Sequence, residues 1–281
     1  MINVKTMHGK GKKLRGEPEA GPLDGQARKN TKLRKLRIDL ALVERGFCES
    51  RDAAQRAILA GRVRIGEILV DKPSRVVDAE APLSLEKPDR YVSRGGHKLE
   101  AALHHFSLDP AGWACLDVGA STGGFTDCLL QQGARRVIAL DVGWGQLHWK
   151  LRQDPRVLVR ERVNARRLRP EDLGETVDLA TADVAFISLR LILPALFPLV
   201  RPEGWIVALI KPQFEAGRSE VGRGGIVRDP EVRQRVVADL RHWLSAWEEV
   251  EDRGVLPSPI LGGSGNHEFL WGLRRTRAPI D

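Results

Sequence analysis

Apolar runs alternate with amphipathic stretches over the last two thirds of the chain. Short apolar runs are typical of buried strands, and apolar residues at helical spacing are typical of helices. The predicted strands are 114–118, 137–140, 157–159, 177–182, 205–210 and 269–273, and the predicted helices include 124–132, 189–200 and 230–247. This alternation predicts an α/β domain, residues 89–281, with a mostly parallel sheet, helices on both faces and a ligand site at the carboxyl ends of the strands.

A shorter pattern precedes this domain. Two amphipathic segments that end at glycines predict two helices, and two β-prone runs separated by a glycine predict a hairpin. The predicted elements are a helix over 37–46, a helix over 51–59 with Ser50 as its N-cap, and strands 63–65 and 68–70 joined through Gly66. The pattern therefore predicts a small α+β domain, residues 37–88.

Composition and length limit the class of protein. The 281 residues are 42% hydrophobic, enough for one large and one smaller domain. No apolar run approaches the roughly 18 residues of a membrane span, and the first residues contain no apolar signal region, so we expect a soluble, cytoplasmic protein without membrane contact. The three cysteines have no metal-ligand spacing, which predicts no metal site. No obligate protein partner is indicated.

The charge balance favours a polyanionic partner. Lys and Arg total 45 against 37 Asp and Glu, a net charge of +8, which is typical of nucleic-acid-binding proteins but can also serve solubility alone. Residues 1–36 are basic and lack apolar periodicity, which predicts a disordered tail. The tail either strengthens RNA binding or reflects a mis-assigned start, because Met7 lies within it.

The predicted strand 114–118 leads directly into a glycine-rich turn and a helix. Glycines allow the backbone to turn sharply and approach a ligand, and a helix start offers free N–H groups. The spacing Gly119-Ala-Ser-Thr-Gly123-Gly124 differs from the dinucleotide fingerprint G-x-G-x-x-G. Asp117 and Asp141, at the ends of the first two strands, match a ligand with an ammonium and a ribose, which predicts S-adenosylmethionine. The alternative is an ordinary turn that caps a helix.

Charged residues also follow or precede other predicted strands. Asp183 and Lys211 follow two of them, Glu268 precedes the last, and Lys98 lies ahead of the first. A lysine directly after a run as apolar as 205–210 is unusual, although its stem could cover the core while its ammonium reaches water. Two lysines and two carboxylates form a group that can orient a hydroxyl and remove its proton.

The small domain resembles the S4 family of RNA-binding domains. The resemblance rests on Arg37-Ile-Asp-Leu-Ala-Leu-Val-Glu-Arg-Gly46, Ser50-Arg51, Ala60-Gly61-Arg62-Val63 and the segment from Gly66 to Pro73. It implies that the two helices present basic side chains to structured RNA, mainly by shape and phosphate contact. The implied RNA-binding residues are Arg37, Arg45, Arg51, Arg56, Arg62 and Arg64; the alternative is a solvated basic face.

The larger domain resembles the FtsJ-like ribose 2'-O-methyltransferases. Lys98, Asp183, Lys211 and Glu268 match in order the Lys-Asp-Lys-Glu tetrad of that family. The segments 93–98, 183–189, 210–215 and 265–269 narrow the resemblance to the hemolysin A or TlyA-type family of ribosomal RNA methyltransferases, over nearly all of 37–273. The resemblance implies a Rossmann-like class I methyltransferase sheet and cytidine 2'-hydroxyls of ribosomal RNA, or of whole ribosomal subunits, as the target.

The same resemblance implies roles for individual residues. Lys211 is the implied base, Asp183 and Lys98 orient it and the attacking oxygen, and Glu268 completes the hydrogen-bond frame. Asn164 and Asp183 are implied near the adenine or the transferred methyl, although an exposed turn asparagine is the alternative for Asn164. The segment 217–228 is expected to be a mobile loop that binds phosphates through Arg218, Arg223 and Arg228, or else an ordinary surface loop. The other implied cofactor contacts are Asp117, Gly119, Ser121, Gly123 and Phe125 along the methionine and Asp141 at the ribose.

Two other classes of protein are weighed against the enzyme. A non-catalytic ribosome-assembly factor would explain the S4-like domain and the charge but would not require the tetrad. A pore-forming hemolysin is suggested by the family's name alone, because the sequence has no membrane spans, barrel strands or secretion signal.

Overall fold

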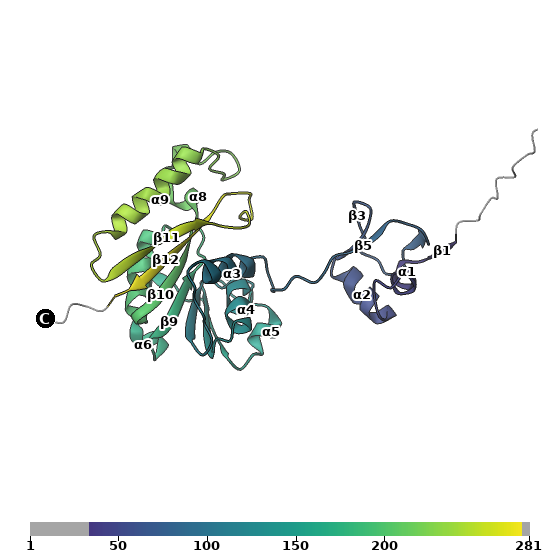
Figure 1. Cartoon of the computed structure of the whole chain (residues 1–281), viewed down its shortest axis with the longest axis horizontal. Coiled ribbons are helices and arrows are strands. Elements are labelled where there is room, and N and C mark those ends of the chain that lie inside the picture. Colours follow the sequence, from purple (N-terminus) through teal and green to yellow (C-terminus); the bar gives the residue numbers. More distant parts are fainter. Residues whose placement is uncertain (1–33, 277–281) are drawn as a thin grey trace, which may run out of the picture. The chain divides into compact units, whose positions relative to one another are not determined.

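The computed structural model describes residues 34–276, and these divide into two compact units between Lys87 and Pro88 (Figure 1). Each unit is described by itself. The predicted basic tail lies outside the described residues up to position 33. Residues 35 and 36, which the sequence pattern assigns to the tail, belong instead to the first strand of the small unit.

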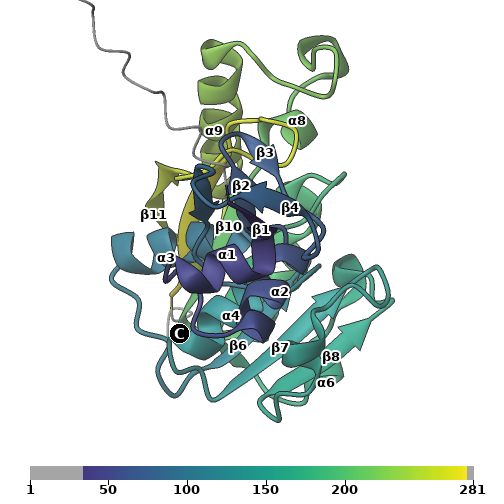
Figure 2. The ribbon, with the colours of Figure 1, turned by 90° about the vertical axis from the view of Figure 1, so that its right-hand side faces the viewer.

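The small unit contains the two predicted helices, α1 (Ile38–Glu44) and α2 (Arg51–Leu59), which pack side by side (Figure 2). The Ser50 hydroxyl accepts a hydrogen bond from the Ala53 backbone N–H at 3.2 Å and so caps α2 as predicted. Apolar side chains on the facing sides of the helices form the core, among them Ile38, Leu42 and Ile58, which are fully buried.

Short strands complete the small unit. The predicted hairpin is present as β2 (Val63–Ile65) and β3 (Ile68–Leu69), with Gly66 in the left-handed region at φ 56°. Three further strands, β1 (Lys35–Arg37), β4 (Val76–Asp78) and β5 (Leu83–Leu85), pair as β1–β4 and β2–β5. Sequence reasoning missed these strands because each has only three residues and, unlike β2 and β3, none is joined to a neighbouring strand through a glycine turn.

The larger unit is built on one seven-stranded sheet with the order β11-β12-β10-β9-β6-β7-β8. The five strands from β8 to β10 are parallel, whereas β12 pairs antiparallel with both β10 and β11. The predicted fold class is confirmed. The strands are β6 (Ala114–Val118), β7 (Arg136–Asp141), β8 (Val157–Glu161), β9 (Val177–Ala182), β10 (Val200–Ile210), β11 (Val250–Pro257) and β12 (Phe269–Arg275).

Helices and short helical turns connect these strands (Figure 1). The predicted helix 189–200 is wrong as a single element: it is divided into η2 (Leu189–Leu191), α7 (Leu193–Leu196) and η3 (Phe197–Leu199), because Pro194 and Pro198 each begin a new helical turn. The other elements are α3 (Gly95–His105), α4 (Gly124–Gln131), α5 (Trp149–Arg152), η1 (Ala165–Arg167), α6 (Pro170–Leu173), α8 (Pro212–Glu215), η4 (Arg218–Glu220) and α9 (Pro230–Leu244).

Two apolar layers cover the two faces of the sheet. In β6 the alternation is direct: Cys115 packs in the layer that contains α3 and α4, while Leu116 and Val118 pack in the layer that contains α7 and α9. Because both faces are buried, the central strands contain almost no exposed residue, as the continuous apolar runs predict. The polar residues therefore gather where the strands end.

Candidate functional site

The glycine-rich turn after β6 requires glycine at two positions. Gly119 and Gly123 have φ values of 83° and 101°, which L side chains rarely adopt. A Cβ on Gly119 would lie 2.5 Å from the Asp183 carbonyl oxygen, and one on Gly123 would lie 2.2 Å from a methyl group of Leu151. The turn thus passes close to the end of β9 and leads directly into α4, whose first N–H groups face the same edge of the sheet.

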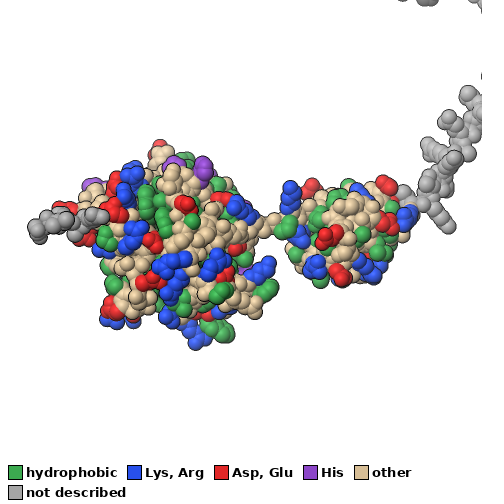
Figure 3. Space-filling model, turned by 60° about the horizontal axis from the view of Figure 1, so that its bottom comes forward, with side chains coloured by type: hydrophobic (Ala, Val, Ile, Leu, Met, Phe, Trp, Pro, Cys, Tyr) green, Lys and Arg blue, Asp and Glu red, His purple; other side chains and the backbone are tan. Residues whose placement is uncertain are grey.

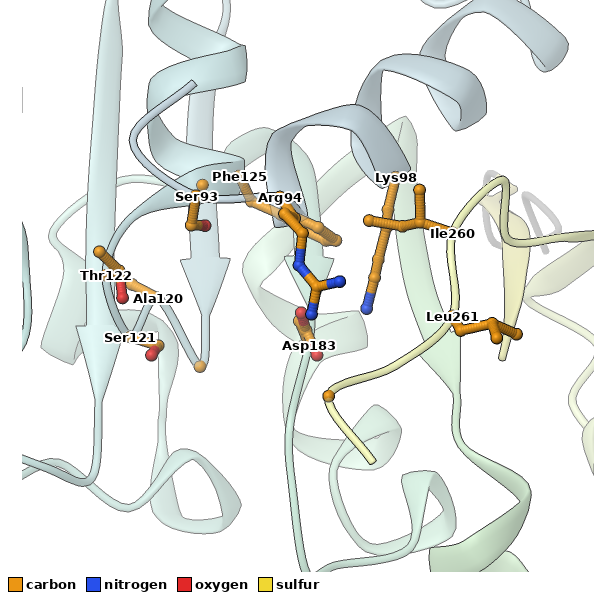
Figure 4. A pocket seen from close by; sticks show the side chains of 14 residues that line it. Ser93, Arg94, Lys98, Ala120, Ser121, Thr122, Phe125, Asp183, Ile260 and Leu261 are labelled. Carbon is orange, nitrogen blue, oxygen red and sulfur yellow. The ribbon is translucent and has the colours of Figure 1, made fainter. Parts of the chain in front are cut away.

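A cavity of about 500 Å³ opens beside this turn (Figure 4). Of the predicted cofactor residues, Gly119, Ser121 and Phe125 line it, whereas Gly123 supports the turn from behind. Its wall also includes two of the predicted tetrad residues. The lining residues are Ser93, Arg94, Gly95, Lys98, Gly119, Ala120, Ser121, Thr122, Gly124, Phe125, Asp183, Ile260, Leu261 and Gly263.

Asp141 joins the ends of β7 and the glycine-rich turn. One carboxylate oxygen accepts a hydrogen bond from the Ser121 backbone N–H at 2.8 Å, and the other accepts one from the Gly143 N–H at 2.6 Å. Ser121 itself is held at φ 48°, in the left-handed region. The carboxylate is half-buried at the carboxyl end of its strand, as predicted for a residue beside the cavity.

Asp117 is placed differently from the prediction. Its side chain is fully buried, and its two oxygens accept hydrogen bonds from the hydroxyls of Thr126 at 2.6 Å and Thr181 at 3.0 Å. Burial raises its pKa to about 6. It does not line the cavity. Asp117 thus joins α4 and β9 to β6 behind the turn, and its contact with a ligand stays a prediction.

The predicted tetrad forms two ion pairs. Lys98 Nζ lies 2.5 Å from Glu268 Oε2, and Lys211 Nζ lies 2.5 Å from Asp183 Oδ1. Both lysines are largely shielded from solvent, with side-chain exposures of 10% and 13%. Buried charges of this kind are costly unless they are paired. Lys98 and Asp183, one from each pair, line the same cavity, and their charged ends face one another there (Figure 4).

Strand order explains why residues so distant in sequence meet. Asp183 follows β9, Lys211 follows β10 and Glu268 precedes the antiparallel β12, so all three lie at one edge of three adjacent strands. Lys98 reaches this edge from the first turns of α3, which packs against α4 and β12. The lysine and carboxylate of the Lys98–Glu268 pair are 170 positions apart in the chain.

The carboxylate of Glu215 joins the segment after Asp183 to the segment after Lys211. Glu215, at the end of the short helix that follows Lys211, accepts hydrogen bonds from the Ser188 hydroxyl at 2.6 Å and the Leu189 N–H at 2.7 Å. Burial raises its pKa above the ordinary value. The rings of Phe186 and Phe214, one from each segment, have centroids 5.1 Å apart. The segment after Asp183 is thereby fixed to the segment after Lys211.

Asn266 and Gly262 position Glu268. The buried Asn266 side chain accepts from the Val227 N–H at 3.0 Å and donates to the Gly225 carbonyl at 2.8 Å. A Cβ on Gly262 would lie 2.2 Å from a Glu268 carboxylate oxygen, so a larger residue there would displace the carboxylate from its present position. The segment 217–228, expected to be a mobile loop, is thus fastened to the strand start that carries Glu268, and Arg218 and Arg223 are exposed on it.

Asn164 has a local role in the structure. Its side-chain oxygen accepts a hydrogen bond from the Arg166 N–H at 3.1 Å and caps the turn η1. It lines a second cavity, formed with residues of β8 and α6, rather than the cavity beside the glycine-rich turn. The structure therefore does not bring Asn164 to the lining of the first cavity.

Most of the predicted RNA-binding arginines of the small unit form an ion pair or a hydrogen bond within that unit. Arg37 and Arg51 pair with the fully buried Asp39 at 2.8 and 3.0 Å, and these guanidinium groups hold the pKa of that carboxyl well below its usual range. Arg64 pairs with Glu86 at 2.8 Å. Arg45 and Arg62 donate to backbone carbonyls. All remain at least partly exposed, as does Arg56, and acidic side chains are interspersed among basic ones on the face shown in Figure 3.

Comparison with known protein families gives two matches. Residues 36–82 match the S4 domain, and residues 91–275 match the FtsJ-like methyltransferase family. The chain belongs to the FtsJ-like methyltransferase family. It is therefore an enzyme of the methyltransferase class with an S4 domain at its N-terminal side, as the sequence resemblance implies.

Individual relatives agree with this membership. The chain is 52% identical over 84% of its length to the provisionally named rRNA methyltransferase YqxC of Bacillus subtilis, and covers 85% of that protein. It is 49% identical over 85% of its length to the 16S/23S rRNA (cytidine-2'-O)-methyltransferase TlyA of Mycobacterium tuberculosis, and covers 90% of it. A solved structure from Streptococcus thermophilus, provisionally named a hemolysin, superimposes with a TM-score of 0.67 at 44% identity, covering 88% of this chain and 90% of that one.

Residues 34–276 contain neither a membrane-spanning helix nor a cluster of metal-ligating side chains. No helix in that range is long and apolar enough to cross a membrane. No group of three or more His, Cys, Asp or Glu side chains in the same range is placed to hold a metal ion.

Several residues of this FtsJ-like site were missed from the sequence. Ser93 and Arg94 line the cavity from the start of α3, and Ile260 and Leu261 line it from the segment before Glu268. The phenylalanine at position 186 is 90% exposed and has a left-handed φ of 62°. Ser93, Arg94 and Phe186 lie in segments that carry the family resemblance, but among the residues of those segments only the tetrad was given a role, and Ile260 and Leu261 lie outside them.

The buried state of Asp117 predicts a pH-dependent stability. Its folded-state pKa of about 6 lies above the ordinary 3.8, so the folded chain binds the proton more tightly than the unfolded chain. The wild type should lose up to about 3 kcal/mol relative to Asp117→Asn as pH rises from about 4 to 7. Tryptophan fluorescence during urea unfolding measures this, because all 7 tryptophans lie in the larger unit. A difference between the two proteins that does not change with pH would contradict the assignment.

The hydrogen bonds that Glu215 accepts from the segment after Asp183 predict that a substitution of Glu215 lowers kcat but not cofactor affinity. Glu215→Gln leaves one of two donors without an acceptor, which we expect to shift the Asp183 and Lys211 segments and to lower kcat at least about tenfold. S-adenosylmethionine affinity should change less than about twofold, because Glu215 does not line the cavity. The matched control is Glu220→Gln, whose carboxylate pairs with Arg235 on the surface. Equal effects of the two substitutions on kcat would refute the positioning role.

Proposed function

We propose that this protein transfers a methyl group from S-adenosylmethionine to a ribose 2'-hydroxyl. We propose further that this ribose belongs to a cytidine in ribosomal RNA. The observation that carries the proposal is the presence of two lysine–carboxylate ion pairs beside the glycine-rich turn. One residue of each pair, Lys98 and Asp183, lines the cavity there. The similarity to the 16S/23S rRNA (cytidine-2'-O)-methyltransferase TlyA of Mycobacterium tuberculosis supports the choice of substrate.

The cavity is compatible with S-adenosylmethionine. Its volume of about 500 Å³ is in the range of small-molecule sites, and the left-handed Gly119 allows close backbone approach. Asp183 offers a carboxylate to the amino group, and Phe125 offers an apolar surface. We assign Gly119, Ser121 and Phe125 to the methionine part and Asp141, through the turn that it holds, to the ribose side. When bound, the cofactor supplies an electrophilic methyl group on a sulfonium.

The tetrad residues can perform the proton chemistry. We assign Lys211 as the base: in its neutral amine form it accepts the 2'-hydroxyl proton and becomes an ammonium, which pairs with the carboxylate of Asp183, 2.5 Å away. Lys98, held by Glu268, is placed to orient the attacking oxygen from the opposite wall of the cavity. Because the Lys98–Glu268 ion pair already holds the ammonium in position, these side chains do not have to rearrange when the reaction occurs.

The mouth of the site offers surfaces for a nucleotide. The phenyl ring of Phe186 projects into solvent three positions after Asp183, and nucleobases stack well on such rings. Arg94 extends its guanidinium into the cavity near Asp183 (Figure 4). We assign Phe186 to a base of the bound RNA and Arg94 to a phosphate near the target.

The small unit is proposed to dock the enzyme on its substrate. Its S4 match supports RNA binding, and the exposed ends of Arg45, Arg56 and Arg62 supply positive charge. We propose residues 37–88 as the docking domain and 89–281 as the catalytic domain. A ribosomal substrate implies that the protein works in the cytoplasm.

The proposal predicts label in RNA. The protein is incubated with methyl-labelled S-adenosylmethionine and with unmethylated small and large ribosomal subunits, separately, and any modified position is mapped for a 2'-O-methyl group. We expect label on a cytidine ribose of at least one subunit. Subunit binding and cofactor binding without label would contradict methyl transfer to these particles and favour an assembly factor. Label on a base would contradict the 2'-hydroxyl assignment.

A further inference from the structure

The edge strand β8 and the turn that follows it contain an unusual group of arginines. Arg160, Arg162, Arg166 and Arg167 are all exposed, and none pairs with a carboxylate within the range 34–276. Arginines elsewhere on the larger unit are commonly paired. Examples are Arg135 and Arg136 with Glu175, Arg156 with Asp154, Arg201 with Asp178, Arg241 with Asp252 and Arg274 with Glu203.

Three of these arginines line the second cavity, which has a volume of about 430 Å³. Arg160, Arg162 and Arg167 line it above an apolar floor that includes Leu140 and Leu168. Asp172 is the one acidic residue in its lining, and its carboxylate already accepts a hydrogen bond from the Arg169 N–H at 2.9 Å. The cavity is therefore lined by guanidinium groups that have no carboxylate partner among residues 34–276.

An exposed aromatic residue lies beside this group. Trp144 is 69% exposed, and the Arg162 guanidinium lies 5.2 Å from the centroid of its ring. Arg162 has a left-handed φ of 59°, a costly conformation for a side chain of this size. Two hydrogen bonds at 3.1 Å, from the Arg162 and Val163 N–H groups to the carbonyls of Gly143 and Asp141, hold this conformation. The strained backbone thus directs the guanidinium over the tryptophan.

Protection of the sheet edge does not explain the group. A charged side chain on an edge strand prevents pairing with other strands, and Arg160 alone, within β8, would serve that purpose. Arg166 and Arg167 lie beyond the strand, in η1. A merely solvated face would also not require an exposed tryptophan with a guanidinium over its ring.

The group lies at the carboxyl ends of the parallel strands, as the proposed reaction centre does. It follows the carboxyl end of β8, and Asp141 at the end of β7 both accepts from Val163 through its backbone carbonyl and holds Ser121 of the first cavity through its carboxylate. A strand of RNA with its target nucleotide in the first cavity can therefore extend along this edge within the larger unit.

We infer that Arg160, Arg162, Arg166, Arg167 and Trp144 form an RNA-binding surface on the catalytic unit itself, in addition to the S4 domain. The arginines bind phosphates that flank the target nucleotide, and Trp144 stacks on an unpaired base. This inference rests on the proposed function, since it takes RNA as the substrate.

The experiment compares two triple variants of the full chain. In the test variant Arg160, Arg166 and Arg167 are changed to Gln, which spares the packed Arg162. The control variant changes Arg135, Arg136 and Arg201 to Gln, an equal loss of charge from arginines whose carboxylate partners occupy them. Binding to the ribosomal subunit that accepts label is measured over a series of KCl concentrations, and S-adenosylmethionine affinity is measured separately.

We expect the test variant to bind the subunit at least about tenfold more weakly. The negative slope of log K against log salt should become less steep by about 2, because fewer phosphates are contacted. Its KM for the subunit should rise while S-adenosylmethionine affinity stays within about twofold, and the control should remain near the wild type. Trp144→Ala should weaken binding with no change in the salt slope, and Trp144→Phe should restore it.

Three outcomes would overturn the inference. The first is an equal loss in both triple variants, which would indicate a general charge effect. The second is weaker S-adenosylmethionine binding with normal subunit binding, which would make the arginines part of the cofactor site. The third is unchanged subunit binding. Failure of the proposed function itself is distinguishable, because it would appear as absence of label with the wild type.

Discussion

The pairing of two shielded lysines with two carboxylates is the interaction on which the site depends. An ammonium with only 10–13% of its side chain exposed must have a partner of opposite charge nearby. Lys98 and Lys211 each have one, and the partners arrive from different strands. Any change in strand order or register would leave a charge unpaired, so the sheet topology and the two ion pairs constrain one another.

The surrounding segments hold these pairs in place. Glu215 ties the segment after Lys211 to the segment after Asp183, and Asn266 and Gly262 fix the approach to Glu268. Behind the glycine-rich turn, Asp117 holds α4 and β9 in place by accepting hydrogen bonds from two threonine hydroxyls. Polar residues thus divide into those that face the cavity and those that hold the facing residues still, a division typical of precise sites.

Local sequence pattern was sufficient for the frame of the molecule. The strands 114–118 and 177–182 were predicted with their observed limits, because strands buried on both faces are continuous apolar runs. The strand β11 was missed because it combines charged residues with Gly254 at φ 104° on a sheet edge. The helix predicted over 189–200 did not account for two prolines.

Side-chain partners were harder to predict than elements. The orientation of Asp117 depends on Thr126 and Thr181, and the second of these is 64 positions away. Likewise, the tethering of Arg37 and Arg51 depends on the burial of Asp39, which follows from the packing of α1 against α2. The tetrad was found from the sequence through family resemblance, whereas Glu215 and Arg94 became visible only when the strands were placed side by side.

The most direct test of the central claim is single-turnover methyl transfer by Lys98→Met and Lys211→Met, with S-adenosylmethionine affinity measured on the same samples. Lys150→Met, on the surface of α5, is the matched control. If the two ion pairs form the reaction centre, both test variants bind the cofactor within about threefold of the wild type and transfer methyl at least about 100-fold more slowly. Transfer at the wild-type rate by either variant would contradict this assignment.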